Sequence, residues 1–501
     1  MYGSGRIEQA SMMANATADK ALTGSSGLWL GLVLSALASL PSLVARFPQM
    51  TDYPAHLASY RVMLERGRDP FLARYYGYDW HWTGNLGADL LAWPLGSLFG
   101  VEIAGRIIVT LIPLLTGLGL VCVSWTLYRR VGMGAVLAFA FIWSPSLLLG
   151  FLNFTLSLAL ALFAFAAWMR LEDRSWRWAV FVPVGLAVWL CHASGWGVLG
   201  VMVFGYEWSR RKGLAAFVAP WPLVFPLFAM LAGEGTNALI SYGRFIVTYK
   251  TAIWFKAMRD QVYALDVIGL LVVLIVIVLA LRRRRIDARL GWAALLMALL
   301  SLAVPRHVFG GDYADYRLVS VALMLACLAI DWRTPAWTVW LAAGLFLARL
   351  GVTTATWHER SQATEAMVAE LDTLPRGAHV AMAIPVDLGD WRITSFEHLA
   401  SYAVVRKSAL ANTNFALRDI HMLRVEEGSF GPGRPFADPC QRILYWGRPH
   451  IDLAAFEPAT HADYLWYVGK VTPVTMPPGS RIIHRTPHSF LARLAKPDTG
   501  G

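Results

Sequence analysis

The sequence predicts a polytopic α-helical membrane protein with about 11 transmembrane helices and a small C-terminal α/β domain outside the cytoplasm. Hydrophobic residues make up 56% of the 501 residues and charged residues only 15%, whereas soluble domains carry about 25% charged residues. Apolar runs long enough to cross roughly 30 Å of hydrocarbon recur along the chain. The 22 tryptophans agree with this class, because indole rings favour the interface between lipid and water.

The spans follow from the apolar runs, and the basic residues then set their orientation. The predicted spans are 27–47, 104–128, 132–150, 152–171, 177–192, 194–209, 214–232, 263–281, 289–305, 317–332 and 335–352. If these spans alternate, the arginine clusters between them fall on one side, which is expected to be cytoplasmic. The same placement explains the net charge of +11 without any nucleic acid. We therefore expect a bacterial inner (plasma) membrane protein with a cytoplasmic N-terminus and an extracytoplasmic C-terminus.

Two segments near the N-terminus need separate interpretation. Residues 1–26 are polar and rich in small residues, which predicts a disordered cytoplasmic N-terminus, and the following span is expected to be a signal anchor. Segment 85–100 is apolar, but counting it as a span would move Arg282 to Arg285 outside. It is therefore interpreted as an interfacial or re-entrant helix. It belongs to a large first external loop, 48–103, within a transmembrane domain that covers 27–352.

Residues 353–501 are richer in charges, prolines and histidines and contain no run long enough to span. They predict an extracytoplasmic α/β domain large enough to fold on its own. Cys440 is its only cysteine, so no disulfide is expected within it. The predicted elements are a helix from Arg360 to Leu374 and strands at Val380 to Val386, Arg442 to Trp446 and Tyr464 to Val468.

Asp52 is the main candidate for chemistry. It lies in the run Thr51-Asp52-Tyr53-Pro54-Ala55-His56, just after the first span and on its outer side. A carboxylate in this place can act as a general base, or orient an acceptor hydroxyl. The alternative is structural, because Asp52 followed by Pro54 also fits the cap position of a helix. His56 lies four residues further on and is a candidate contact for a substrate.

Other polar residues are candidates for substrate binding. The aromatic run from Tyr75 to Trp82 contains Asp79 and His81, and it is typical either of an interfacial belt or of a surface that stacks on sugars and lipids. Asn153 and His192 lie near the outer ends of spans, where a polar side chain either satisfies a neighbouring helix or contacts a substrate.

Several cations fall on the outer side, against the usual distribution of positive charge. They are Lys250, Arg306, His307 and Arg317. One explanation is that they bind the phosphate of a lipid-linked donor. The other explanation is ion pairing, either with lipid headgroups or with Asp312 and Asp315, which lie in the run that ends at Arg317.

The sequence contains no Walker phosphate loop, no His-Glu-x-x-His, no Cys-x-x-Cys and no Gly-x-Ser-x-Gly motif. The cytoplasmic loops are too short for a nucleotide-binding domain. A donor is therefore expected to be a membrane lipid reached from outside, and no metal or other cofactor is expected.

The order of these parts resembles the GT-C superfamily of integral membrane glycosyltransferases. The matching stretches are Leu95 to Arg106, with its Phe-Gly turn before the second span, Tyr128-Arg129-Arg130 at the end of that span, and Ser144-Pro145 in the next. The resemblance covers roughly 27–350 in layout and implies a GT-C-like fold and a polyprenyl-phosphate sugar donor.

By this resemblance Asp52 takes the position of the catalytic acid in the first external loop. Arg317 or Arg306 takes that of a cation that holds the donor phosphate. The chain departs from many members, since Tyr53 stands where they have a second acid and Asn153 where metal-dependent members have carboxylates. These departures argue against a divalent metal.

The sequence thus predicts a glycosyltransferase of the cell envelope that moves a sugar from a polyprenyl-phosphate donor to an extracytoplasmic glycan, lipid or protein, with Asp52 as the base. Two alternatives stay open. One is a transporter or flippase for a lipid-linked or amphiphilic substrate, although no internal repeat is visible. The other is a non-catalytic membrane assembly subunit.

Overall fold

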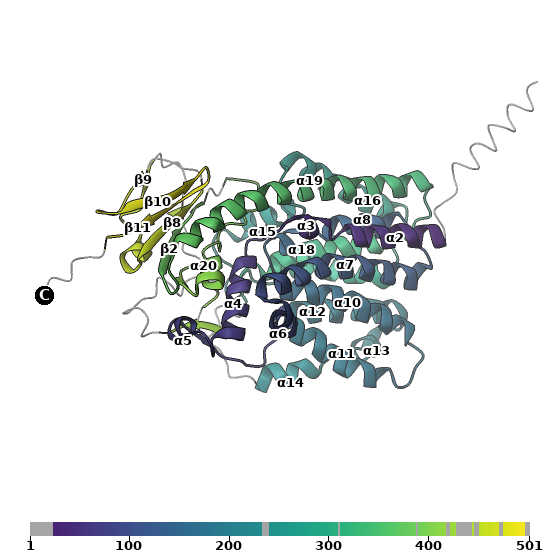
Figure 1. The fold of residues 1–501 in the computed structure, drawn as a ribbon. Coiled ribbons are helices and arrows are strands. Elements are labelled where there is room, and N and C mark those ends of the chain that lie inside the picture. The colour runs from purple at the N-terminus through teal and green to yellow at the C-terminus, as the bar shows by residue number, and fades with distance from the viewer. Residues whose placement is uncertain are drawn as a thin grey trace, which may run out of the picture.

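A computed structural model describes residues 24–232, 240–308, 311–386, 389–416, 421–426, 443–444, 450–469 and 474–495. The chain is mostly helical, and a small sheet lies at one end of the helical body (Figure 1). The predictions for residues 1–23 and for Cys440 lie outside the described residues.

Among the described residues, five helical segments are long and apolar enough to cross a membrane. They are Ser25–Val44, which contains α2 (Ser25–Leu37) and α3 (Leu40–Val44), α7 (Val101–Tyr128), α10 (Leu152–Arg170), α16 (Tyr263–Arg282), and Ala336–Thr373, which contains α19 (Ala336–Ala369). The chain therefore has the character of a membrane protein, while the expected number of about 11 spans is not confirmed.

The remaining predicted spans are either shorter helices or segments that are broken near a proline. Proline lacks an N–H donor and clashes with the preceding helical turn. The segment expected at 132–150 divides into α8 (Met133–Ala138) and α9 (Pro145–Leu148), and the segment expected at 214–232 divides into α13 (Gly213–Val218) and α14 (Phe225–Ala232). The other shorter helices are α11 (Arg177–Cys191), α12 (Ala193–Arg210), α17 (Ala288–Ala303) and α18 (Ala314–Leu328).

Helix α6 (Gly87–Phe99) is the segment expected to be interfacial. Its 13 residues extend about 20 Å, which is too short to cross the hydrocarbon core. Ala88, Asp89 and Ala92 on one face are buried, whereas Trp93 and Leu98 on the other are exposed. This distribution suits a helix that lies along a surface.

Helix α19 joins the helical body to the C-terminal region without a break. The sequence predicts a span that ends at 352 and a separate helix from Arg360, but the structure has one helix through both, since neither proline nor glycine interrupts residues 352–369. Its 34 residues extend about 50 Å, more than a bilayer core requires. The buried Trp357 ring packs against Trp143 with centroids 4.9 Å apart.

The C-terminal region contains a mixed five-stranded sheet in the order β10-β11-β8-β2-β4. Strand β2 (His379–Ala383) pairs in parallel with β4 (Leu410–Ala411) and β8 (Tyr464–Val468), and β11 (Ser489–Arg493) pairs antiparallel with β8 and β10 (Arg481–Thr486). The short remaining strands are β1 (Tyr76–Tyr78) with β5 (Leu423–Val425), β3 (Pro385–Val386) with β6 (Ile443–Leu444), and β7 (Ile451–Asp452) with β9 (Val474–Thr475). The expected strand Tyr464 to Val468 is thus confirmed, and Val380 to Val386 divides between β2 and β3.

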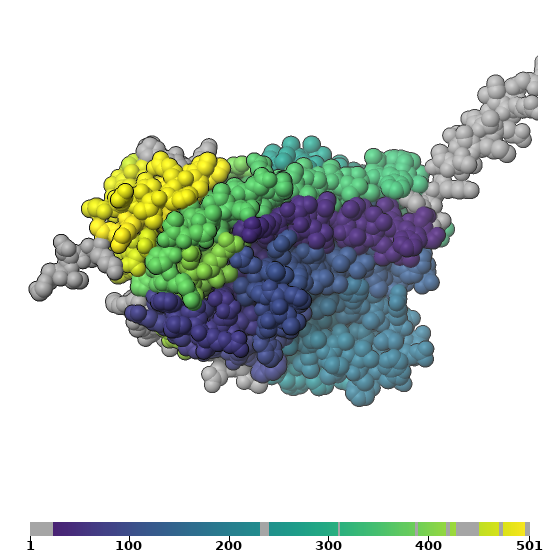
Figure 2. Space-filling view, viewed as in Figure 1, coloured from purple at the N-terminus to yellow at the C-terminus, as the bar shows by residue number. Residues whose placement is uncertain are grey.

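The C-terminal region is not independent of the helical body. Buried residues of the first external loop, of α19 and of the C-terminal region form one continuous core. Helix α20 (Ser401–Lys407) packs against α4 (Tyr53–Glu65) of segment 48–103, and the C-terminal residues, drawn in yellow, lie beside the green residues at one end of the molecule (Figure 2). Arg406 adds a bidentate ion pair to Glu102, with both N–O distances 3.0 Å. The region therefore shares a core with the helical body, and its ability to fold alone stays a prediction.

Tyr76 provides a specific test of this docking. Its buried hydroxyl donates to the Ala409 carbonyl at 3.2 Å and accepts from the Ala411 amide and the Asn414 side chain at 3.1 and 3.2 Å. Tyr76→Phe leaves these partners unsatisfied and is expected to lower the free energy of unfolding by about 1–3 kcal/mol, measured as a lower melting temperature in detergent. Tyr263→Phe, on a ring that is 54% exposed, is the matched control. Equal melting temperatures for the two variants would contradict the docking role.

Candidate functional site

Asp52 lies at the start of α4, where the chain leaves the first helical segment. Its backbone N–H donates to the Leu149 carbonyl at 3.0 Å, and the Thr51 N–H donates to the Leu148 carbonyl at 3.2 Å. The Asp52 carboxylate makes no capping hydrogen bond to the helix, so helix capping does not explain the residue. The side chain is only 17% exposed, and it therefore does not face open solvent.

Gly150 allows the close approach of the two backbones. It has φ of +94°, and a Cβ at this position would lie 2.9 Å from the Asp52 Cβ and 3.0 Å from its amide nitrogen. The Gly150 carbonyl oxygen also lies 3.2 Å from the His56 Nε2. The sequence between α9 and α10 thus fixes both Asp52 and His56.

Three histidines surround the Phe415 ring next to Asp52. The ring centroids of His56, His398 and His421 lie 5.3, 4.9 and 5.2 Å from that of Phe415. Burial lowers the pKa of His56 and that of His421 to about 4 each, so both imidazoles are neutral near pH 7. His398 differs from them, because its Nε2 lies 3.6 Å from the Asp52 Oδ1.

Arg317 faces the same region from the start of α18. Its guanidinium lies over the Phe151 ring, 4.3 Å from the centroid. The Asp52 carboxylate is close enough to attract this guanidinium electrostatically. Its buried Nε has no hydrogen-bond partner, and among the described residues Arg317 makes no ion pair within 4 Å. Arg317 also lines a narrow pocket in the helical body. The hydroxyl residues of this pocket are Thr116, Ser144, Ser146, Thr155 and Ser320.

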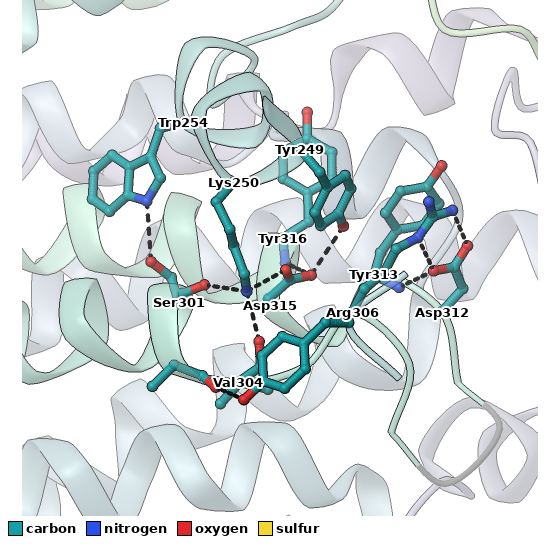
Figure 3. Close-up of polar contacts among 12 residues, drawn as sticks. Tyr249, Lys250, Trp254, Ser301, Val304, Arg306, Asp312, Tyr313, Asp315 and Tyr316 are labelled. Atoms are coloured by element: carbon teal, nitrogen blue, oxygen red, sulfur yellow. Dashed lines mark hydrogen bonds and ion pairs between the residues drawn. The ribbon is translucent and has the colours of Figure 1, made fainter. Parts of the chain in front are cut away.

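Lys250, Arg306 and His307 have partners within the protein. The Lys250 Nζ lies 2.6 Å from the Asp315 Oδ2, and it donates to the Ser301 and Val304 carbonyls (Figure 3). Arg306 binds Asp312 through two hydrogen bonds of 2.7 and 2.8 Å, and the His307 Nδ1 lies 3.4 Å from the same carboxylate. Of the two explanations for these cations, ion pairing describes Lys250 and Arg306, and Arg317 is left as the cation suited to a ligand.

Asn153 and His192 contact neighbouring helix ends. The Asn153 side chain accepts from the Ala88 N–H at 2.5 Å and donates to the Asp89 carboxylate at 3.2 Å, which holds the start of α10 against α6. The His192 Nδ1 accepts from the Ser194 N–H at 3.0 Å and caps α12. Both side chains therefore have structural roles, although His192 is also close enough to Arg317 to be affected by its charge.

Asp79 and His81 lie in an exposed part of the first external loop. Asp79 pairs with Arg424 at 2.7 Å and is 59% exposed, and His81 is exposed as well. Trp80 and Trp82 of the same run are 47% and 81% exposed. The structure does not bring these residues into the group around Asp52.

Sequence reasoning missed His398, His421 and Asp89. The two histidines follow Asp52 by more than 340 residues, and only the high histidine content of the C-terminal region pointed to them. Burial raises the pKa of Asp89 to about 6 despite its hydrogen bond from Asn153. Asp89 was visible in the sequence as a carboxylate within an apolar segment, which is a signal of a buried polar role.

Within the described parts of the chain, no three or more His, Cys, Asp or Glu side chains form a group that could hold a metal ion. In comparisons with known proteins, no family model and no curated protein matches the chain. The function is therefore inferred from the geometry.

Gly150→Ala tests the contact that fixes Asp52. The added methyl group meets the Asp52 backbone, and alanine is strained at this φ, so we expect the free energy of unfolding to fall by more than about 1 kcal/mol. Thermal unfolding in detergent measures this loss. Gly200→Ala, where nothing lies within 4 Å of the new Cβ, is the control. A Gly150→Ala protein as stable as the control would show that the two backbones are not in close contact.

The half-buried histidines His56 and His421 predict a pH dependence of stability. The unfolded chain takes up protons at His56 and His421 near pH 6.5, whereas the folded chain does so only near pH 4. Because the unfolded state binds more protons between these values, the free energy of unfolding should fall as the pH is lowered from about 6.5 to 4.

Melting temperatures measured across this pH range should fall less steeply for His421→Gln than for the wild type. His358→Gln, which changes an exposed histidine of α19, should leave the slope unchanged. An unchanged slope in His421→Gln would contradict the burial of a neutral imidazole at that position.

Proposed function

We propose that the chain is a GT-C-like membrane glycosyltransferase. It transfers a sugar from a polyprenyl-phosphate donor to a hydroxyl acceptor outside the cytoplasm. The proposal includes an inner (plasma) membrane location with a cytoplasmic N-terminus, and a function in building the cell envelope. The acceptor class is a glycan, a lipid or a protein.

The observation that carries this proposal is the placement of Asp52 and Arg317. A shielded carboxylate faces the same region as a cation that makes no ion pair with the residues the structure describes, and the cation also lines a pocket inside the helical body. An enzyme that cleaves a sugar from a lipid phosphate requires a base for the acceptor and a cation for the departing phosphate. These two groups supply both requirements.

In the proposed reaction the acceptor oxygen attacks the anomeric carbon of the donor sugar. A bond forms between that oxygen and the carbon, and the bond between the carbon and the phosphate oxygen breaks. Asp52 takes the proton of the acceptor hydroxyl. Arg317 stabilises the negative charge that builds on the departing lipid phosphate, with an effect that is large in a site shielded from water.

The exposed aromatic run of the first external loop is the proposed contact for a bulky acceptor. Trp80 and Trp82 present large exposed rings, and Asp79 and His81 stand beside them. Aromatic faces stack on sugars as well as on lipid. A surface of this kind suits an acceptor that extends beyond the immediate surroundings of Asp52.

A transporter or flippase of a lipid-linked substrate is the second candidate. The observation that favours it is the narrow pocket within the helical body, which is lined by apolar residues, five hydroxyl residues and Arg317. A transporter needs a sealed compartment, whereas an enzyme releases polyprenyl phosphate from its donor in detergent. Activity that appears only in sealed vesicles, without any release of polyprenyl phosphate, would favour transport.

Asp52→Asn tests the proposed base. In detergent, with a panel of polyprenyl-phosphate sugars and membrane extract as the acceptor, the wild type should release polyprenyl phosphate and the variant should lose at least about 100-fold in rate. Size-exclusion chromatography should recover equal amounts of folded protein. Wild-type activity in the variant would contradict the proposed mechanism. A wild-type protein that never releases polyprenyl phosphate would instead favour a transporter or an assembly subunit.

Arg317→Gln tests the proposed phosphate contact. We expect a loss of roughly 100- to 1000-fold in rate, since one donor to the developing charge is removed. Arg282→Gln is the matched control, because it changes an exposed arginine at the C-terminal end of α16. Equal activities of these two variants would remove Arg317 from the site.

A further inference from the structure

The C-terminal region supplies an imidazole to the Asp52 carboxylate. His398 lies just before α20, is buried, and places its Nε2 3.6 Å from the Asp52 Oδ1. The chain around it is held to the membrane domain, since the Thr51 hydroxyl donates to the Thr394 carbonyl at 2.6 Å. His398 is therefore a fixed neighbour of Asp52, although 346 residues separate the two in the sequence.

The other ring nitrogen determines which form of His398 is present. The Nδ1 forms a hydrogen bond with the Thr413 carbonyl oxygen. A carbonyl oxygen only accepts, so the Nδ1 carries a hydrogen. In a neutral imidazole the Nε2 then has a lone pair, and this lone pair faces the carboxylate. Two lone pairs at this distance repel each other unless a proton is bound to one of them.

Further charged and titratable groups of the described residues lie around the pair. His56 on α4 and His421 are neutral near pH 7 for the reason given above, and Arg317 on α18 contributes a permanent positive charge. The His398 Nε2 lies at an ion-pair distance from the Asp52 carboxylate. A proton bound between these two groups would remove the repulsion of their lone pairs.

We propose that Asp52 and His398 share one proton, and that His398 is a positioning residue which sets the protonation state of the base. In the protonated pair, an imidazolium holds Asp52 as a weakly basic carboxylate. When this proton leaves to solvent, the neutral Nε2 faces the carboxylate and makes Asp52 a stronger base. Asp52 then takes the proton of the acceptor hydroxyl while the new bond to the sugar forms and the bond to phosphate breaks. The catalytic consequence rests on the proposed function, whereas the shared proton does not.

The shared proton is tested without any substrate. Protein with 13C-labelled histidine is titrated by NMR in detergent, and the His398 signal is identified as the one lost in His398→Gln. We expect His398 to release its proton at a pH about 1 unit or more higher in the wild type than in Asp52→Asn, because a carboxylate within ion-pair distance favours the imidazolium. His358→Gln is the control for loss of a histidine signal. Identical His398 titrations in the wild type and in Asp52→Asn would overturn the proposal.

The consequence for transfer is tested by the pH profile of the rate. The wild-type rate should rise with pH through the titration of His398. His398→Gln should lose this inflection and on the order of 100-fold in rate, with an unchanged yield of folded protein. An inflection that persists in His398→Gln would overturn the role of His398 in transfer.

The two proposals fail in different ways. A wild type that shows the NMR coupling but transfers no sugar would refute the proposed function and leave the shared proton in place. Transfer that depends on Asp52 in a protein without the NMR coupling would refute the shared proton alone. If the His398→Gln protein does not fold, Asp52→Asn still tests the shared proton, because this variant removes the partner carboxylate and retains the imidazole.

Discussion

The close contact between Asp52 and Gly150 is the constraint on which the candidate site depends. Two loop backbones meet there, one donating from the Asp52 N–H to the Leu149 carbonyl and the other turning at a positive φ that favours glycine. The same turn places a carbonyl against His56. The Asp52 backbone is thus fixed by backbone contacts, which suits a group that must meet a reacting hydroxyl with little freedom of position.

The distribution of ion pairs distinguishes Arg317 from the other cations of the helical body. Removing a charge from water is costly unless a partner compensates, and Lys250, Arg306 and Arg349 each have a carboxylate partner. Arg317 instead lies over the ring of Phe151, an interaction that offsets only part of such a cost. A bound anion near Arg317 would complete its contacts, and a lipid phosphate at the end of the helical body is an anion of suitable kind.

Hydropathy and charge placement were sufficient to predict the membrane character and to bring Asp52, His56 and Arg317 to one side. They could not predict the helix breaks at individual prolines, which leave the number of spans unconfirmed, or the continuity of α19 beyond residue 352. Lys250 and Arg306 were ambiguous, because Asp312 stood in the same loop as Arg306, and Asp315, the partner of Lys250, stood only three residues further on. The role of His398 could not be predicted from the sequence, because its contact with Asp52 depends on how the C-terminal region docks. No local sequence pattern encodes that docking.

The place where a polyprenyl phosphate binds is the most direct measure of the central claim that Asp52 and Arg317 form one reaction centre. A cryo-electron microscopy structure of the full chain with this lipid would locate the phosphate. The account predicts phosphate oxygens in hydrogen-bond contact with the Arg317 guanidinium, on the side that faces Asp52. A phosphate bound at the opposite end of the helical body, near Arg282 to Arg285, with the Arg317 guanidinium still unpaired, would contradict it.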